Sequence, residues 1–364
     1  MTSHQNRLQT TFIRYGAFCT LLIFLLLSAI VSGCQQIQKV LSPDEPTRRK
    51  VCPENKRVLN LGFYAYFDPV SYSADDDPTS EGFNAHRGYE ADLLTALETM
   101  DDTNFSFSRK GIAEWPGIWL KAANPEYDII AGGITILETR TQDATGTPRV
   151  VFTSGHITFR QSLLVRAEDA SRLSDYASLT RDIRVGVLSD TTGEARLLEL
   201  TGIVNANGVL ADGTRIKTSQ GTVIADGTSN YIITAAEASL NLVGRHHLFS
   251  PSDNLPQIVY LGDETGESEL LEALADGRID AIARGEIGNQ NAAHVAGSSF
   301  VITALDDQIE YGGFTLAVED VELLACIDKG LGYLTDDGNI GYGEWLQDPM
   351  VFIIRAEMWN AGER

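Results

Sequence analysis

One stretch constrains the fold of this chain more than any other: residues 115–140, W-P-G-I-W-L-K-A-A-N-P-E-Y-D-I-I-A-G-G-I-T-I-L-E-T-R. Residues 116–123 predict a short helix, because a proline at an early helical position loses no hydrogen bond. The compact apolar run 127–131 is typical of a strand buried on both faces. Gly132 and Gly133 end this strand and let the backbone come close to whatever lies beyond its tip.

Two polar residues, Thr135 and Arg140, follow in the loop after this strand. Ligands of open α/β sheets bind outside the carboxyl ends of the strands. Arginine has a planar fork that binds a carboxylate through two parallel hydrogen bonds. We therefore expect Arg140 to bind an anionic small molecule, with a second contact from the hydroxyl of Thr135. The alternative is an ordinary surface arginine.

Residues 133–140, G-I-T-I-L-E-T-R, resemble the G-(M/I)-T-I-T-x-E-R signature of family 3 extracellular solute-binding proteins, the polar amino-acid receptors of ABC importers. The preceding tryptophan, short helix and Y-D-I-I-A-G-G strand are similar to the same pattern. The resemblance implies that Arg140 holds the α-carboxylate of a ligand. It also implies ligand contacts for Thr135 and Gly133.

Further segments resemble this family in the same order, over residues 57–203 and 258–348. In the family, an aromatic residue after the first strand forms one wall of the ligand cleft. Phe67 takes that position here, with Tyr64 close by. Trp115 corresponds to the second cleft aromatic, and a buried structural tryptophan is the alternative.

The segment S-D-T-T-G-E, residues 189–194, is expected to face the cleft from the second lobe. Thr191 and Glu194 have the spacing of a capping box, which predicts a helix start with free backbone N–H groups. The family holds the ligand carboxylate with the equivalent turn, which implies roles for Thr191 and Thr192. Asp190 stands where the family usually has glycine, and this extra anion would repel a carboxylate or receive an ammonium.

The position that would bind the ammonium group of a ligand departs from the family pattern. In the family, an aspartate after the strand equivalent to 279–283 pairs with the α-ammonium of the ligand. An ungapped alignment puts Gly285 there, with Glu286 one step on. Glu286 is therefore the first candidate for the ammonium partner and Asp190 the second.

The first 33 residues contain no acid, two arginines and an apolar run from 17 to 31, as in a secretory signal peptide. They end in V-S-G-C, which resembles a bacterial lipobox with Cys34 as the lipidated residue; an uncleaved anchor is the alternative. The polar residues up to 56 read as a spacer. We expect an exported protein held at the cell membrane by acyl chains, on the periplasmic or outer face.

The remaining cysteines, Cys52 and Cys326, both fall in the first lobe under this interpretation. An exported compartment permits a disulfide between them, and two separate thiols are the alternative. No cysteine or histidine spacing indicates a zinc site, and no cofactor is expected. The net charge of −22 argues against nucleic acid and anionic membrane surfaces as partners.

The resemblance implies an α/β architecture: the two-lobed periplasmic-binding-protein (type II) fold, with two crossover strands and hinge closure over the ligand. Lobe one is expected over 57–160 and 312–350, and lobe two over 161–311. Within lobe two, residues 204–257 have no family counterpart. They carry two similar segments with Asp-Gly between β-formers, which predicts a β-rich insertion.

The expected function is a monomeric receptor that binds a small amino acid or related carboxylate and delivers it to an ABC permease and its ATPase. One alternative is an enzyme, since cyclohexadienyl (arogenate) dehydratases resemble this family. They carry a glutamate general acid near the usual aspartate position, which Glu286 would supply. A lipoprotein that senses a ligand without transport is the other alternative.

Overall fold

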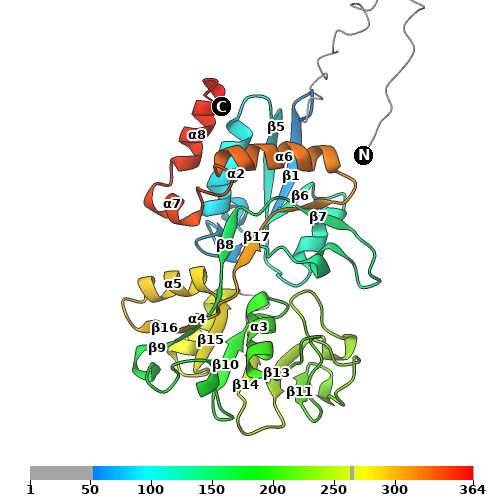
Figure 1. Ribbon diagram of the computed structural model, residues 1–364, viewed down its shortest axis with the longest axis vertical. Helices are drawn as coiled ribbons and strands as arrows, with labels where there is room; N and C mark the ends of the chain where they lie inside the picture. The colour runs from blue at the N-terminus through cyan, green and yellow to red at the C-terminus, as the bar shows by residue number, and fades with distance from the viewer. Residues whose placement is uncertain (1–51, 263–265, 364) are drawn as a thin grey trace, which may run out of the picture. The chain divides into compact units, whose positions relative to one another are not determined.

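Two β-sheets, each covered by helices, form the part of the chain that the computed structural model describes, residues 52–262 and 266–363 (Figure 1). The expected signal peptide, the lipidation site Cys34 and nearly all of the spacer lie outside these residues. Within them, no helix is long and apolar enough to cross a membrane. We call the two sheets with their helices lobe one and lobe two.

Lobe one is built on a five-stranded sheet in which β1 lies parallel to both of its neighbours, while β18 lies antiparallel to its own. The strands in spatial order are β5 (Phe105–Ile112), β1 (Arg57–Tyr64), β6 (Ile129–Ala131), β18 (Thr315–Ala317) and β7 (Val150–Phe152). A small sheet beside it consists of β2 (Tyr66–Phe67), β3 (Ser71–Ser73) and β4 (His86–Arg87).

The helices of lobe one are α2 (Tyr89–Thr99), α6 (Val321–Leu334), α7 (Tyr342–Gln347) and α8 (Val351–Asn360), and α2 packs against both α6 and α8 (Figure 1). Helix α8 was not predicted from the sequence. Its Phe352 is fully buried and makes an edge contact with Tyr89 of α2, with ring centroids 5.5 Å apart. A disulfide between Cys52 and Cys326 ties the start of the described chain to α6.

Lobe two is built on an eight-stranded mixed sheet. The strands in spatial order are β12 (Gly221–Ile224), β11 (Arg215–Thr218), β13 (Arg245–Phe249), β14 (Gln257–Tyr260), β10 (Arg184–Val187), β15 (Ala281–Gly285), β9 (Gln161–Arg166) and β16 (Phe300–Leu305). Its helices are α3 (Thr192–Thr201), α4 (Glu267–Ala275) and α5 (Glu286–Val295). The 3-10 helices of both lobes are η1 (Glu81–Asn84), η2 (Ile118–Ala123), η3 (Glu138–Thr141), η4 (Ala167–Asp169), η5 (Tyr176–Ser178) and η6 (Leu240–Leu242).

Two antiparallel strands connect the lobes, β8 (Ile157–Phe159) and β17 (Glu310–Gly312) (Figure 1). The chain leaves lobe one through β8 into β9, and returns from β16 through β17 into β18. Because only this strand pair carries the chain between the sheets, it is the natural hinge for opening and closing.

The segment 204–257 is part of the lobe-two sheet, since β11, β12 and β13 continue it beyond β14. The β11–β12 hairpin turns at Ser219 and Gln220, and the two Asp-Gly pairs lie on either side of it. Gly213 and Gly227, at φ +80° and +74°, instead lead the chain into and out of the hairpin. The left-handed conformation serves both bends, and the Gly213 N–H donates to the Ala225 carbonyl at 2.9 Å.

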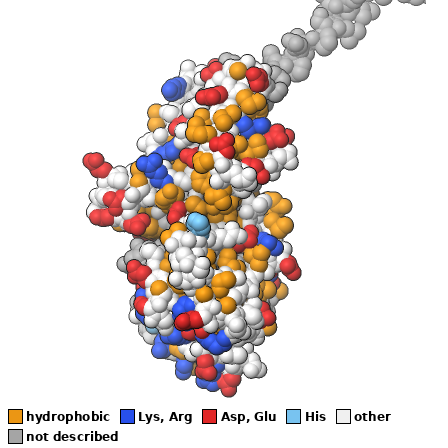
Figure 2. All heavy atoms as spheres, turned by 90° about the vertical axis from the view of Figure 1, so that its left-hand side faces the viewer, with side chains coloured by type: hydrophobic (Ala, Val, Ile, Leu, Met, Phe, Trp, Pro, Cys, Tyr) orange, Lys and Arg blue, Asp and Glu red, His pale blue; other side chains and the backbone are white. Residues whose placement is uncertain are grey.

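Charged side chains of both signs are interspersed over the face that Figure 2 displays, and hydrophobic side chains gather near its middle. The negative net charge is therefore not gathered into one acidic field on this face.

Candidate functional site

Strand β6 ends in a tight turn of two glycines that donates its backbone N–H groups to the buried carboxylate of Glu90. The N–H groups of Gly132 and Gly133 donate to Glu90 at 2.7 and 3.0 Å, and Nε2 of His156 lies 2.9 Å from the same carboxylate. Gly133 has φ +65°, and a Cβ there would lie 2.5 Å from the Phe67 ring. The turn therefore needs glycine for two reasons, backbone conformation and the close approach of an aromatic wall.

A pocket of about 60 Å³ lies between the lobes at this turn. Seven of the residues predicted to bind a ligand line it: Tyr64, Phe67, Trp115, Gly133 and Thr135 from lobe one, and Thr191 and Thr192 from lobe two. The other lining residues were not predicted as ligand contacts, although Gly285 is the position that the ungapped alignment gave for the family's aspartate: Phe159, Gln161, Leu188, Gly193, Glu267, Arg284 and Gly285. Three predicted residues, Arg140, Asp190 and Glu286, are not part of the lining.

The aromatic lining forms a connected wall. Tyr64 makes an edge contact with Trp115, with ring centroids 5.0 Å apart, and both residues are buried. The Trp115 Nε1–H donates across the cleft to the Asp190 carbonyl at 3.1 Å. Trp115 is therefore at once a pocket wall and a bond between the lobes.

Arg140 is fully buried, so it is not an ordinary surface arginine. Its guanidinium lies 4.3 Å from the centre of the Trp119 ring and donates to three backbone carbonyls. Two bonds reach Ala235 at 3.0 and 2.8 Å, and the others reach Asp190 at 3.1 Å and Thr135 at 3.3 Å. Burial lowers the pKa of Arg140 to about 10, against the opposing fields of nearby carboxylates.

The cation of Arg140 is therefore held by neutral oxygens, two of them from lobe two. Among the residues that the structure describes, no carboxylate forms an ion pair with it. The sequence predicted the carboxylate of a ligand as the partner of Arg140. In this structure backbone carbonyl oxygens accept its hydrogen bonds.

The lobe-two turn explains the aspartate that replaces the usual glycine. Asp190 has φ +59°, the left-handed conformation that glycine adopts without strain. Its carboxylate accepts a hydrogen bond from Arg245 at 2.8 Å, so it is not directed at the pocket as an unpaired anion. Thr191 caps α3 as predicted, accepting from the Glu194 N–H at 3.1 Å. The reciprocal carboxylate contact goes to the Asp190 N–H, at 2.6 Å, instead of the N-cap itself.

Behind this turn lies a buried ion pair that the sequence did not suggest. Glu194 is fully buried and binds Arg245 through two hydrogen bonds of 3.0 and 2.9 Å. Arg245 belongs to β13, so the segment 204–257 supplies the cation that supports the cleft turn. Burial raises the pKa of Glu194, and the neighbouring guanidinium opposes this shift.

Glu286, predicted to face a ligand ammonium, lies outside the pocket lining. Glu286 is the first residue of α5, its N–H donates to the Arg160 carbonyl, and its carboxylate lies 3.9 Å from Nε of Arg160. The backbone of Gly285 lines the pocket instead. Glu286 is thus one residue beyond the lining, and its role toward an ammonium group stays a prediction.

A buried polar network forms where the two crossover strands meet. The Glu310 carboxylate accepts from Thr135 Oγ1 at 3.0 Å and from Gln161 Nε2 at 2.9 Å. The same amide nitrogen donates to Thr192 Oγ1 at 2.8 Å. Thr135, Gln161 and Glu310 are each at most 5% exposed. A glutamine at the head of an apolar strand was the one signal in the sequence that could have revealed this network.

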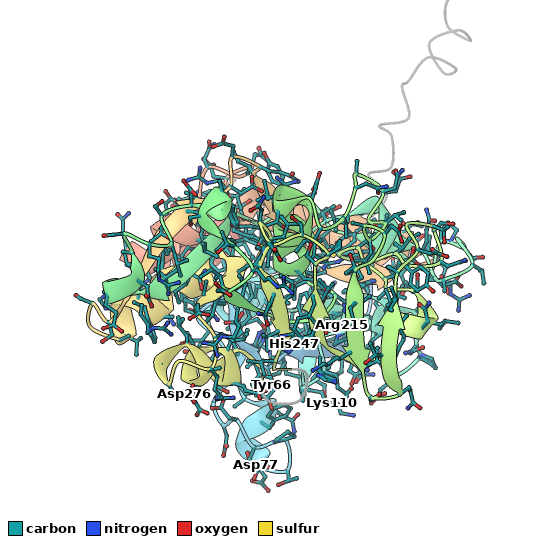
Figure 3. All side chains as sticks on the ribbon, turned by 90° about the horizontal axis from the view of Figure 1, so that it is seen from below. Tyr66, Asp77, Lys110, Arg215, His247 and Asp276 are labelled. Atoms are coloured by element: carbon teal, nitrogen blue, oxygen red, sulfur yellow. A yellow bond between two sulfur atoms is a disulfide. The ribbon has the colours of Figure 1, made fainter. Side chains whose placement is uncertain are left out.

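A larger cavity of about 510 Å³ adjoins the small pocket, and the ion pair of Glu267 and Arg284 lines both. Burial raises the pKa of Glu267, and Arg284 opposes this shift. The cavity also spans the lobes, since Asn291 donates to Asp68 at 2.9 Å. Tyr66 lies in its wall, at the base of a projecting segment that carries Asp77 (Figure 3).

No group of three or more histidine, cysteine or acidic residues among the described ones could hold a metal ion. His246 and His247 form no such group, and His247 stacks on Phe249 with ring centroids 4.3 Å apart.

No protein-family model matches the sequence, and no curated protein matches it. Solved structures match the fold. The ancestral amino-acid-binding protein AncCDT-1, a precursor of cyclohexadienyl dehydratase, superposes with a TM-score of 0.51 at 19% identity, over 83% of this chain and 95% of that one. The holo arginine-binding protein of T. maritima gives 0.51 at 17%, over 79% and 96%. The ABC transporter substrate-binding protein AbpA of Streptococcus pneumoniae, bound to L-arginine, gives 0.52 at 13%, over 82% and 95%.

The chain therefore has the two-lobed α/β fold of periplasmic binding proteins, as the sequence predicted. The neighbours named above are amino-acid-binding proteins, and one of them is a precursor of an enzyme. At these identities the likeness concerns the fold alone.

Proposed function

We propose that this protein is an extracytoplasmic receptor that binds a small amino acid or related carboxylate between its lobes and delivers it to an ABC importer. One observation carries the proposal: residues far apart in the sequence, from both lobes, converge on one small pocket at the tip of β6. Aromatic rings form its walls, and hydroxyl and amide groups together with the ion pair of Glu267 and Arg284 form its polar part. This composition is typical of small-molecule sites.

The pocket of about 60 Å³ holds little more than the smallest amino acids, so larger ligands require the lobes to separate. Opening at β8 and β17 would withdraw the carbonyls of Ala235 and Asp190 from Arg140. The exposed guanidinium would then attract the carboxylate of a ligand. On reclosure the ligand carboxylate would replace neutral oxygens with a charged partner, which favours the liganded closed form.

Thermal unfolding in the presence of each standard L-amino acid tests the proposal. A ligand at a hundredfold its Kd stabilises the native state by about 2.7 kcal/mol, which raises the midpoint by several degrees. Thr192→Val should reduce the shift, because Thr192 lines the pocket. Thr222→Val on the exposed strand β12 is the matched control and should leave it unchanged. Wild-type protein whose midpoint no amino acid raises would contradict the receptor function.

A dehydratase is the second candidate, favoured by one observation: Glu267 lines the pocket, and burial raises its pKa. General acid catalysis needs a carboxyl that stays protonated near neutral pH. Incubation with arogenate or prephenate tests this activity. Turnover by the wild type that disappears in Glu267→Gln would replace the receptor by an enzyme.

Export, lipid anchoring and delivery to a permease and ATPase are parts of the proposal that rest on the sequence before residue 52 and on the resemblance. Fractionation of cells tests the anchor. Cys34→Ser should move the protein from the membrane to the soluble fraction, and Cys19→Ser, within the leader, should not.

A further inference from the structure

The carboxylate of Glu310 fixes the direction of every hydrogen bond around it. An ionised carboxylate only accepts hydrogen bonds. Gln161 must therefore turn its amide nitrogen toward Glu310, at 2.9 Å, and Thr135 must spend its hydroxyl proton on Glu310, at 3.0 Å. The second proton of the Gln161 amide goes to Thr192 Oγ1.

This arrangement leaves acceptors in the pocket. Oε1 of Gln161 is buried and has no hydrogen-bond partner among the described residues, although Gln161 is only 2% exposed. Thr135 Oγ1 donates its proton to Glu310 and lies 3.4 Å from Thr192 Oγ1, whose hydroxyl can donate to it, so one further acceptor position remains on Thr135. Both residues line the pocket. A buried polar atom without a partner is unfavourable, so this site favours a ligand that donates hydrogen bonds.

The charge at the site points the same way. Glu310 makes no ion pair within the described part of the chain, and it is 5% exposed. Two other acids near the pocket have direct cationic partners: Asp190 shares Arg245 with Glu194, and Glu267 pairs with Arg284. Burial lowers the pKa of Arg140 and the field of Glu310 opposes this shift, but no cation of the described residues pairs with this carboxylate directly, so it can also attract a cationic group of a ligand.

We propose that Glu310 is the specificity-determining anion of this pocket, and that it orients Gln161 Oε1 and Thr135 Oγ1 to bind a primary ammonium group of the ligand. The inference rests on the proposed function and deepens it, because it limits the ligands to compounds with a protonated amino group. Gln161 begins β9, and Glu310 begins β17. Ammonium recognition is thereby assigned to the two strands at the lobe junction, instead of to helix α5.

Paired ligands that differ only in the amino group test the inference. Isothermal titration calorimetry would compare L-amino acids with their 2-hydroxy acids: alanine with lactate, glutamate with 2-hydroxyglutarate, and phenylalanine with phenyllactate. For the pair that binds, the amino acid should bind the wild type tenfold to a hundredfold more tightly, as expected for a charged hydrogen bond.

Glu310→Gln should reduce this preference at least tenfold, because a neutral amide can donate to Gln161 Oε1 and carries no charge. Glu286→Gln removes the same charge from the rival position at the start of α5, and Glu319→Gln, an exposed glutamate, is the matched control; the preference should persist in both. Gln161→Met, of similar size but without the acceptor, provides a second variant. Urea unfolding checks that each variant is folded.

The outcomes separate this inference from the proposed function. If the wild type binds an amino acid and its 2-hydroxy acid equally, or if Glu310→Gln keeps the preference, the inference is overturned and the receptor stands. If Glu286→Gln loses the preference instead, the ammonium site belongs to α5. If the wild type binds only the 2-hydroxy acids, the inference is likewise overturned and the receptor stands; if it binds neither kind of compound, the proposed function itself fails.

Discussion

The buried pair of Glu194 and Arg245 allows a quantitative test of how segment 204–257 supports the cleft. Arg245→Met removes the cation and keeps most of the side-chain volume. It leaves a fully buried carboxylate without its charged partner, since Glu194 then keeps only the Asp190 N–H. Breaking a buried ion pair from one side costs about 3–5 kcal/mol, and we expect this loss in the free energy of unfolding.

The partner variant completes a double-mutant cycle. Glu194→Gln should cost less than Arg245→Met, because Arg245 still has Asp190 at 2.8 Å. In the double variant both buried charges are gone, so at least half of the loss should be regained. The coupling energy should therefore be about 2–3 kcal/mol. Urea unfolding of the four proteins, followed by far-UV circular dichroism, measures each term.

The pH dependence of the deficit follows from the raised pKa of Glu194. A carboxyl whose pKa is higher in the folded than in the unfolded state binds its proton more tightly in the folded state. Acidification therefore stabilises the folded protein at this group. Arg245→Met removes the opposing cation, so its deficit should be largest near neutral pH and shrink on acidification. A deficit below about 1 kcal/mol, a double variant as unstable as Arg245→Met, or a deficit that grows at low pH would refute the reasoning.

Two further predictions concern the glycine turn of the pocket and the disulfide. Gly133→Ala should abolish ligand-induced stabilisation and lower the unfolding free energy by about 1–3 kcal/mol, because its Cβ would clash with Phe67. The control is Gly117→Ala, at a similar φ of +71° but with open space around the position. In thermal unfolding the control should show only the smaller cost of the backbone conformation. The disulfide between Cys52 and Cys326 joins residues 274 positions apart in the sequence. Its reduction should lower the free energy of unfolding by up to about 5 kcal/mol, and with it the urea midpoint. Equal midpoints with and without reductant would show that the bond does not stabilise the fold.

Helices and strands with a clear local pattern of apolar residues could be predicted from the sequence. The first strand at 57–64 has the predicted bounds, and the helix at 321–334, predicted from the resemblance, also matches residue for residue. The helix has buried leucine and isoleucine residues at helical spacing. The short helix predicted for 116–123 is instead a 3-10 helix that begins at Ile118, because the left-handed conformation of Gly117 delays its start.

The contacts of the site depended on distances that no local pattern contains. The sequence singled out Arg140, but its carbonyl partner Ala235 lies 95 residues away, in a segment without a family counterpart. The resemblance directed attention to Glu286 because it is adjacent in sequence to the expected position. The carboxylate beside the pocket, Glu310, comes from the other crossover strand. Only the pairing of the two crossovers brings it to Gln161.

The continuity of β11, β12 and β13 with the rest of the lobe-two sheet has a consequence for engineering this protein. Excision of residues 204–257 would not yield a smaller receptor with the same cleft. It would turn β14 from an interior strand into an exposed edge, where unpaired backbone groups invite association with other chains. An attempt to trim the chain to the size of its solved neighbours is therefore expected to produce aggregates.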